Sequence, residues 1–345
     1  MGRKQGGWGR VTLKSCTVIE QDFSSFNGIL KTLRGQGDPV ELDRTGSSAS
    51  RSRMGICIHW QPVGPVMVKA EVEGNAVDML PLTSRVEGGS LSFVIPGSSL
   101  KGSLRSQAER IIRTLLKQDI PNDEDPKQRF LDQTKGLPII RELFGEAARM
   151  GKNENGSREQ LGYLGSLKSD DCYAQSVRLS TEQWQEISTA EDSQHLVAAL
   201  NQAKLNQTKL NQTQQAFHVA IDRWTGGAAD GFLYSTLEPM GIQWDPIQLR
   251  LDLDRAGESR LSIVALLLFL IQDLAKGRIP IGFGVNRGYG AIEITQVELK
   301  VQGDPKTLDI LKDLNGMKLA EGDISAIPKN VLETLQNAWQ QEVHS

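Results

Sequence analysis

Hydrophobic positions along the chain predict two long helices and several short strands. Apolar residues recur at the 3.6-residue spacing of a helix across Ser99–Lys117, whereas Arg260–Lys276 is apolar on nearly every side, as in a buried helix. Strands and helices do not alternate as a regular βαβα series, so the pattern predicts an α+β fold. Runs typical of strands cover Met54–Trp60, the neighbourhood of Val66–Val72, Phe93–Ile95, Ile247–Leu253 and Ala291–Val297.

The more polar regions predict how the chain is divided. Residues 1–50 are rich in Gly and Ser and predict an N-terminal arm. Residues 51–300 carry the predicted strands and helices of one main domain. Within it, residues 118–160 are expected to be an insertion that adds little core, and the Gln/Asn-rich residues 182–216 are expected to be a surface insertion. Residues 301–345 are expected to form a mostly helical C-terminal extension.

Charge and cysteine usage narrow the class of protein. The chain has 39 Lys and Arg against 42 Asp and Glu, which excludes a uniformly basic surface for non-specific DNA binding but allows local basic patches. Its longest apolar run, Ile263–Ile271, is too short for a bilayer span of about 20 residues, so we expect no membrane partner. Cys16, Cys57 and Cys172 show no C-x-x-C spacing and favour a reducing, cytoplasmic setting. No metal-ligand spacing links the histidines, at positions 59, 195, 218 and 344.

The segment Ile95-Pro-Gly-Ser-Ser-Leu-Lys-Gly-Ser-Leu-Arg105 predicts a turn that leads directly into a helix. The first peptide N–H groups of a helix are unpaired and carry positive dipole, so they attract phosphate. The side chains of Ser98, Ser99 and Lys101 add donors, and Arg105 continues the positive charge along the helix. Taken alone, the same residues fit an ordinary helix, capped by Ser98 or Ser99, with a solvated basic face.

Two further segments carry glycines beside charged or aromatic residues. Gly282–Gly290 has four glycines, and its Arg287 and Tyr289 offer a charge and a stacking face; a structural turn is the simpler interpretation of these residues alone. Phe217–Tyr234 predicts a hairpin or long loop around Thr225-Gly-Gly227. Its aromatic residues could grip a nucleic acid or simply lie in the core.

Together these motifs resemble the RAMP superfamily (repeat-associated mysterious proteins). More narrowly, the chain resembles the guide-RNA-binding backbone subunits of type III CRISPR–Cas effector complexes, the Csm/Cmr-type group. The matching motifs, in family order, are Ile95–Arg105, Ile221–Ala228 and Arg287–Gly290, and the resemblance covers about residues 54–300. It implies a modified RRM-like, ferredoxin-type palm with inserted finger segments and a thumb hairpin at about residues 217–240.

The resemblance also implies partners and site residues. Copies would stack along a CRISPR RNA (crRNA), beside other RAMP subunits and the large subunit, and each thumb would interrupt the duplex between guide and complementary target RNA. The implied thumb residues are His218, Ile221, Asp222 and Trp224. The implied RNA-binding residues are Ser98, Ser99, Lys101, Arg105, Arg223, Gly284, Arg287, Gly288 and Tyr289.

Members of the family that cut target RNA use one Asp in the loop before the Ile-Pro-Gly-Ser-Ser strand. The matching position is Asp78, within Ala76–Thr83. The resemblance therefore implies a divalent-metal-dependent endoribonuclease in which Asp78 is both the catalytic residue and a ligand of Mg²⁺ or Mn²⁺. Without the family context, a lone Asp in a polar loop is usually a turn or cap residue.

The N-terminus carries a second copy of the terminal glycine motif. Gly6-Gly-Trp-Gly-Arg-Val-Thr-Leu13 has the same form as Arg287-Gly-Tyr-Gly-Ala-Ile-Glu-Ile294, which closes a RAMP unit in this family. Our hypothesis is that residues 1–45 are the tail of a preceding RAMP unit in a tandem fusion. The alternative is a coincidental glycine turn.

Two other functions stay open at the level of sequence. A scaffold RAMP subunit would bind guide RNA without cutting, and it differs from a cutting subunit only in the role of Asp78. A stand-alone RAMP endoribonuclease would process guide RNA precursors with a histidine as general base. His59, on the first predicted strand, is the candidate for that base.

Overall fold

The computed structural model describes residues 18–35, 37–40, 51–133, 136–152, 158–205 and 212–344. The chain divides into two units, Met1–Ser50 and Arg51–Ser345. In the first unit, strand β1 (Val18–Glu20) pairs antiparallel with β2 (Asp38–Val40), and helix α1 (Phe26–Leu33) lies between them in sequence.

Local hydrogen bonds set the start of α1. The Ser25 hydroxyl accepts a hydrogen bond from the Gly28 N–H at 3.0 Å, as expected of an N-cap serine. The hydroxyls of Ser24 and Ser25 donate to the Asp22 carboxylate and lower the pKa of Asp22 to about 2. The Gly6–Leu13 motif lies outside the described residues, so the tandem fusion stays a hypothesis.

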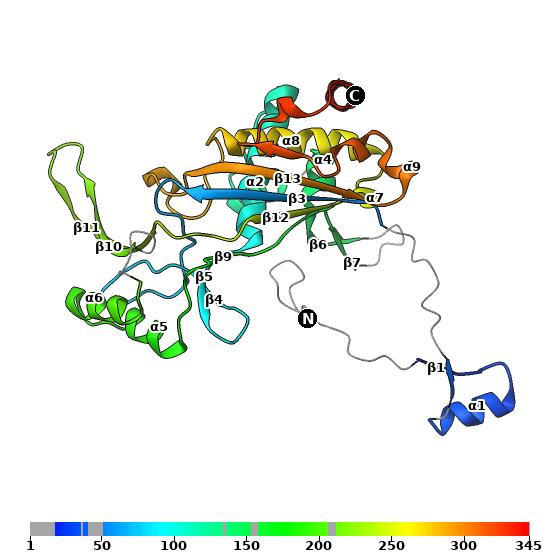
Figure 1. Ribbon diagram of the computed structural model, residues 1–345, viewed down its shortest axis with the longest axis horizontal. Coiled ribbons are helices and arrows are strands. Elements are labelled where there is room, and N and C mark those ends of the chain that lie inside the picture. Colours follow the sequence, from blue (N-terminus) through cyan, green and yellow to red (C-terminus); the bar gives the residue numbers. More distant parts are fainter. Residues whose placement is uncertain are drawn as a thin grey trace. The chain divides into compact units, whose positions relative to one another are not determined.

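The second unit contains a ferredoxin-type palm, which confirms the predicted α+β class. Its central sheet has the strand order β14-β13-β3-β12-β8, and every neighbouring pair is antiparallel. Without β14, the chain order of strands and helices is βαββαβ and the first and last of these strands are adjacent (Figure 1). The elements are β3 (Arg53–Pro62), α2 (Gly97–Leu116), β8 (Leu167–Ser169), β12 (Ile247–Asp252), α8 (Arg260–Ala275) and β13 (Ile292–Gln302), with β14 (Lys318–Ala320) added at the edge.

Alternation of apolar and polar residues gives the palm sheet two different faces. Met54, Ile56 and Ile58 of β3 are fully buried, on the face that packs against α2 and α8. The residues between them point to the other side, because successive side chains in a strand alternate. We call this second side the open face; it carries Cys57, His59, Gln248, Arg250 and Lys300, which are half-buried or exposed.

Helix α8 is apolar on nearly every side because it is covered on nearly every side. One side contacts β13, and another packs against α10 (Lys329–His344), with the Phe269 and Trp339 rings 5.5 Å apart in an edge-to-face arrangement. The predicted buried helix is therefore confirmed, and its cover comes from the C-terminal part of the chain.

The other elements extend the palm. A small sheet combines β4 (Thr83–Arg85), β5 (Leu91–Ile95) and β9 (Cys172–Tyr173). The hairpin of β10 (Gln212–Ile221) and β11 (Ala228–Met240) projects from the body and is the predicted thumb (Figure 1). The remaining elements are β6 (Glu146–Lys152), β7 (Arg158–Tyr163), α3 (Pro126–Gln133), α4 (Pro138–Phe144), α5 (Thr181–Ser188), α6 (Ser193–Gln202), α7 (Leu253–Ala256), α9 (Pro305–Leu308) and the 3₁₀ turns Gly257–Ser259, Val285–Arg287, Asp309–Leu314 and Ile324–Ala326.

Two expectations about this unit were wrong. Val66–Val72 forms no strand: its backbone makes an isolated bridge between Lys69 and Pro81, and the Met67 carbonyl accepts from the Phe283 N–H instead of from a strand. Residues 118–160 do add core, because α4 buries an apolar side within the palm cluster: Leu137, Ile139, Ile140, Leu143 and Phe144 are all at most 5% exposed.

Candidate nucleic-acid interface

The first turn of α2 is packed tightly against the palm. A Cβ atom at Gly97 would lie 2.3 Å from the Ser169 carbonyl oxygen, so a side chain there cannot be accommodated. The Gly97 N–H donates to the Asp171 carboxylate at 2.8 Å. The expected cap by Ser98 or Ser99 was therefore wrong: Pro96 is the N-cap, and Asp171 satisfies the first N–H from a distant segment. This leaves Ser98 exposed and Ser99 half-buried.

Two cations one helical turn apart on α2 have unsatisfied nitrogen atoms. Lys101 is only 8% exposed, and its Nζ has no hydrogen-bond partner among the described residues. Arg105 donates to Glu109 through Nε at 2.8 Å and to the Gly145 carbonyl through Nη1 at 3.1 Å. Its Nη2 is buried and has no hydrogen-bond partner among the described residues. Burial, together with the Arg105 charge, lowers the pKa of Lys101 to about 8. Buried cations of this kind gain most from an anion supplied by a ligand.

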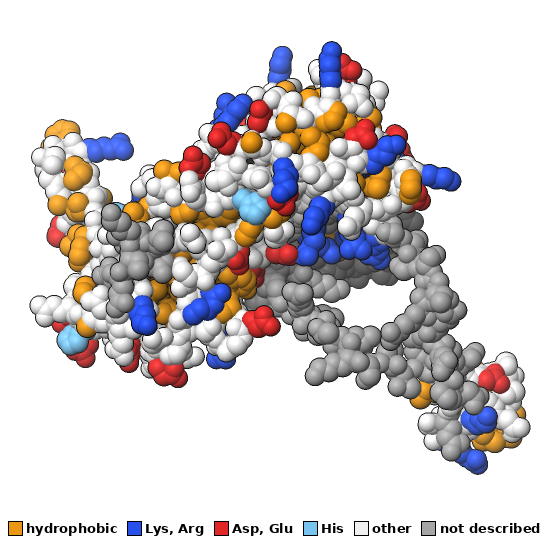
Figure 2. All heavy atoms as spheres, in the orientation of Figure 1, with side chains coloured by type: hydrophobic (Ala, Val, Ile, Leu, Met, Phe, Trp, Pro, Cys, Tyr) orange, Lys and Arg blue, Asp and Glu red, His pale blue; other side chains and the backbone are white. Residues whose placement is uncertain are grey.

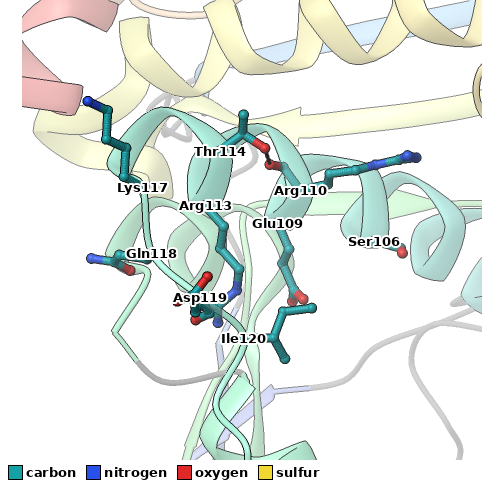
Figure 3. A pocket seen from close by; sticks show the side chains of 9 residues that line it. All are labelled: Ser106, Glu109, Arg110, Arg113, Thr114, Lys117, Gln118, Asp119 and Ile120. Atoms are coloured by element: carbon teal, nitrogen blue, oxygen red, sulfur yellow. Dashed lines mark hydrogen bonds between the residues drawn. The ribbon is translucent and has the colours of Figure 1, made fainter.

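The C-terminal half of α2 borders a hollow of about 670 Å³ (Figure 3). Arg113 donates to the Asp119 carbonyl at 3.2 Å, and in Figure 3 Arg110 and Lys117 point away from Arg113. The basic side chains share this hollow with Glu109 and Asp119. Its charge is therefore nearly balanced, whereas Lys101 and Arg105, the cations with unsatisfied nitrogen atoms, lie in the N-terminal half of α2.

The Gly282–Gly290 loop is fixed to the segment before it by its glycines. A Cβ atom at Gly282 would lie 2.2 Å from the Met67 carbonyl oxygen, and one at Gly290 would lie 2.3 Å from the Ile281 carbonyl oxygen. Both glycines also have positive φ angles, of 88° and 82°. These glycines therefore have a structural role, and they present Arg287 at the surface, 4.6 Å from the centre of the Tyr234 ring.

Tyr289 lies inside the protein and not at the surface. It is 5% exposed, so its ring is not available as the stacking face that the sequence suggested. Its hydroxyl donates to the buried Glu238 carboxylate and lies 2.9 Å from His218 Nε2, which is 3.3 Å from Glu238. The His218 ring stacks on Tyr234 with ring centres 5.2 Å apart. This cluster joins the Gly-rich loop to the base of the β10–β11 hairpin, and burial together with Glu238 raises the pKa of Tyr289.

Asp78 lies at the same hairpin base, on the other side of β11. Its Oδ2 accepts hydrogen bonds from the Ser235 N–H at 2.7 Å and the Ser235 hydroxyl at 3.1 Å. The Met79 N–H and carbonyl bond to Ser235 and Leu237, so the loop adds a short parallel bridge to β11. The Asp78 side chain is exposed, and its Oδ1 has no hydrogen-bond partner among the described residues. The hydrogen bonds to one oxygen thus orient the carboxylate, and the other oxygen is left for a ligand.

The outer part of the hairpin is apolar and exposed. Trp224 is 96% exposed, and Phe232 and Leu233 are 62% and 67% exposed. Figure 2 shows hydrophobic side chains along this projection, so the interpretation that its aromatic residues lie in the core was wrong. Asp222 shapes the turn, because its carboxylate accepts from the Thr225 hydroxyl at 2.7 Å and the Trp224 N–H at 3.0 Å. Ile221 and Arg223 are exposed beside it.

Comparison with protein families identifies this arrangement. A model of the RAMP superfamily matches residues 80–293, which is more than half of the chain and includes the α2 start, the hairpin and the Gly-rich loop. This chain belongs to the RAMP superfamily. No curated protein matches it.

As a RAMP protein, the chain is a CRISPR-associated RNA-binding protein, and RNA and other Cas subunits are its classes of partner. Within the described residues, none of the helices combines the length and apolarity that a membrane crossing requires. The sites found above are therefore considered as contacts for RNA and for protein subunits.

The sequence-predicted residues fall into three sets. Asp78, His218, Arg287 and Tyr289 lie at the hairpin base, with Gly284 and Gly288 in the loop beside Arg287. Ser98, Ser99, Lys101 and Arg105 lie on α2, and Ile221, Asp222, Arg223 and Trp224 lie at the hairpin tip. Sequence reasoning missed the partners that hold these residues in place. Asp171 caps α2, Ser235 orients Asp78 and Glu238 binds Tyr289. No local motif marks these three, because each acts on a residue far away in the sequence.

The two candidate catalytic residues have different surroundings. Asp78 is the only carboxylate in its contact set, so the described residues do not build a closed metal site around it. A Mg²⁺ ion is commonly held by one or two carboxylates plus substrate phosphates, and a single oriented carboxylate fits that mode only with RNA present. His59 lies instead on the open face of the palm sheet, beside Cys57 and Glu298.

Proposed function

We propose that this RAMP protein is a backbone subunit of a type III, Csm/Cmr-type CRISPR effector complex that binds guide RNA and cleaves complementary target RNA. The observation that carries the proposal is the position of Asp78. An exposed carboxylate, oriented by two hydrogen bonds from Ser235, lies where the thumb hairpin leaves the palm. A target strand that is interrupted by the hairpin would pass this carboxylate.

The guide would be held by α2. The buried ammonium of Lys101 and the free Nη2 of Arg105 would gain phosphate oxygens as partners, with Ser98 and Ser99 as further donors. Arg287, with Gly284 and Gly288 beside it, would add a phosphate contact at the hairpin base, and Arg223 another near the tip. The hairpin tip would place Trp224 against a base, since an almost fully exposed indole offers a large stacking surface.

The chemistry proposed for Asp78 is activation of a ribose. Its Oδ1 would take the proton of a target 2′-hydroxyl while the 2′ oxygen attacks the adjacent phosphorus to form a 2′,3′-cyclic phosphate. The bond from phosphorus to the 5′ oxygen then breaks, and that oxygen takes a proton from water. When bound with RNA, Mg²⁺ or Mn²⁺ would neutralise charge on the phosphate, and Asp78 would supply its one protein ligand.

The test is cleavage of a labelled RNA, complementary to the guide, by the assembled complex with Asp78→Ala. We expect cuts to disappear while target binding persists, with a rate loss of about 10²–10⁴-fold, the range for a positioned acid or base. Ser235→Ala keeps the backbone donor but removes the hydroxyl donor, so it should slow cutting by about tenfold, in line with one hydrogen bond.

The matched control is Glu73→Gln, an exposed carboxylate in the same connecting segment that, among the described residues, pairs only with Lys69, at 3.5 Å. It should leave the cutting pattern unchanged. An unchanged pattern with Asp78→Ala would show that this subunit is a scaffold that binds guide RNA without cutting.

A further inference from the structure

Three potential metal ligands meet in the middle of the open face. Cys57 and His59 lie two residues apart on β3, so both side chains point to the same side of the sheet. Glu298 of β13 is directly opposite Cys57 in the sheet register. Among the described residues, this is the one group of three His, Cys, Asp or Glu side chains whose ligand atoms all lie within 4.8 Å of one another.

The register of β13 helps to bring Glu298 into place. The pairing of β13 with β3 shifts between Ile294 and Gln296, so Thr295 is an extra residue opposite the Trp60–His59 step. Bulges of this kind re-aim side chains next to functional sites. After the bulge, Gln296 and Glu298 both face the open side, next to His59 and Cys57.

The distances are compatible with ligands of one tetrahedral ion as well as with direct contacts between the side chains. Cys57 Sγ lies 3.6 Å from His59 Nε2, and His59 Nε2 lies 3.8 Å from Glu298 Oε1. With Zn–S near about 2.3 Å and Zn–N and Zn–O near about 2.0–2.1 Å, tetrahedral ligands are separated by about 3.6 Å for S and N and by about 3.3 Å for N and O. The His59–Glu298 separation is thus about 0.5 Å wider than a tetrahedral ion requires, which a small movement of Glu298 would close.

We propose that Cys57, His59 and Glu298 bind one divalent ion of the zinc class, with a fourth position open to water. Thiolate, imidazole and carboxylate are the ligand types that zinc takes, and three protein ligands plus an open position is a common arrangement. The two negative ligands would neutralise the ion. The open position lies near a hollow of about 510 Å³ that His59 lines together with Trp60, Gln175, Trp244 and Thr295.

The surroundings indicate what the ion has to displace. Glu298 Oε1 accepts from Lys318 at 3.1 Å and from Gln296 at 2.7 Å, and the Cys57 sulfur accepts from Gln248 at 3.0 Å. Burial raises the pKa of the Cys57 thiol, so the metal-free site holds a neutral thiol, and binding releases its proton. Lys318 competes with the ion for Glu298, which makes the affinity sensitive to that one side chain.

The proposed site has a consequence for His59 that does not depend on Asp78. Metal coordination uses the Nε2 lone pair, which a general base would need. A zinc-bound His59 would therefore not act as the general base, and the ion would link β3 to β13 across the centre of the palm sheet. The proposal stands whether or not the subunit cuts RNA.

The experiment titrates the full-length protein with Co²⁺ and with Zn²⁺. A Co²⁺ ion bound to Cys57 should give thiolate-to-cobalt charge-transfer absorption and tetrahedral d–d bands, at one ion per chain, and Zn²⁺ should displace it. Cys57→Ser should abolish the charge-transfer band. Glu298→Gln keeps the shape of the side chain and should weaken Zn²⁺ binding more than about 100-fold, because removing a mere hydrogen-bond partner of a ligand already costs about 10–100-fold.

Two further variants make the test specific. Lys318→Ala removes the competitor of the ion and should tighten Zn²⁺ binding several-fold, a direction that general damage to the fold would not produce. Cys172→Ser is the thiol control, because Cys172 is buried and donates to the Asp245 carbonyl on another part of the palm, so the cobalt band should persist. The proposal is overturned if folded protein gives no thiolate band, or if the band survives Cys57→Ser.

Discussion

The base and the tip of the β10–β11 hairpin are built in opposite ways. At the base, Tyr289 and His218 contact the Glu238 carboxylate, which is 6% exposed, and Ser235 donates to Asp78 on the other side of β11. At the tip, the Asp222 carboxylate stabilises the turn through hydrogen bonds, and large apolar side chains face solvent. The hydrogen bonds at the base thus hold its side chains in a fixed geometry. The apolar side chains at the tip are instead exposed, and they become buried only when a binding partner covers them.

This comparison predicts that changes at the base cost stability and changes at the tip cost binding. Tyr289→Phe should destabilise the hairpin base and lower the free energy of unfolding. It removes the hydroxyl that donates to the buried Glu238 carboxylate and leaves His218, at 3.3 Å, as a remaining partner of that carboxylate. Loss of a hydrogen bond to a charged group costs about 1.5–3 kcal/mol. We expect the free energy of unfolding to fall by that amount in denaturant titrations.

Tyr234→Phe is the control for that prediction. It keeps the ring that contacts His218 and Arg287 and removes only the hydroxyl, so stability should change by less than about 0.5 kcal/mol. Equal losses for the two variants would contradict a special role for the Tyr289–Glu238 contact.

Trp224→Ala should affect the tip alone. Because the indole is 96% exposed, stability should stay within about 0.5 kcal/mol of wild type. Loss of one stacking contact should weaken target RNA binding by about 1–3 kcal/mol, or roughly 5–150-fold, measured by filter binding on the assembled complex. A variant with reduced stability and normal binding would reverse the proposed division between base and tip.

The smallest expected effect is the dependence of stability and guide RNA affinity on pH through Lys101 of α2. This helix is a third region, which resembles neither the rigid base nor the open tip. The folded-state pKa of Lys101, about 8, lies below its ordinary value of 10.5, so the folded state gives up this proton first as pH rises. Between pH 8 and 10.5 the unfolded state binds more protons, and this lysine makes stability rise with pH in that window. Guide RNA needs the charged form, so its affinity should instead fall a few-fold between pH 7 and 9.

Lys101→Gln tests this assignment, because it removes the titrating group while keeping a polar side chain of similar length. Guide RNA affinity should be lower and its dependence on pH between 7 and 9 should be flatter than in the wild type. Identical pH profiles would assign the dependence to another group.

The sequence predicted those parts of the molecule whose signals are local. The strands at β3, β12 and β13 and the helices α2 and α8 follow from periodicity, and the hairpin follows from its glycine turn. The predicted strand at Val66–Val72 was wrong because its apolar residues bury one side of a loop that two other loops hold in place. Such long-range packing leaves no periodic pattern in the sequence. Of the candidate site, only the residues that belong to sequence motifs could be predicted. The contacts of Asp171, Ser235 and Glu238 with the site depend on how distant strands and loops come together in the fold, which one sequence does not reveal.

The adjacency of β3 and β13 has a consequence for how the protein is made. Arg53 pairs with Gln302, so the centre of the palm sheet joins an early strand to one of the last. During synthesis, β3 emerges with one edge that cannot be paired until residues 292–302 have also left the ribosome. Closure of such a long loop makes folding slow, and an open apolar strand edge is a site of aggregation. A nascent chain stalled before residue 292 should therefore depend on chaperones far more than the finished protein does.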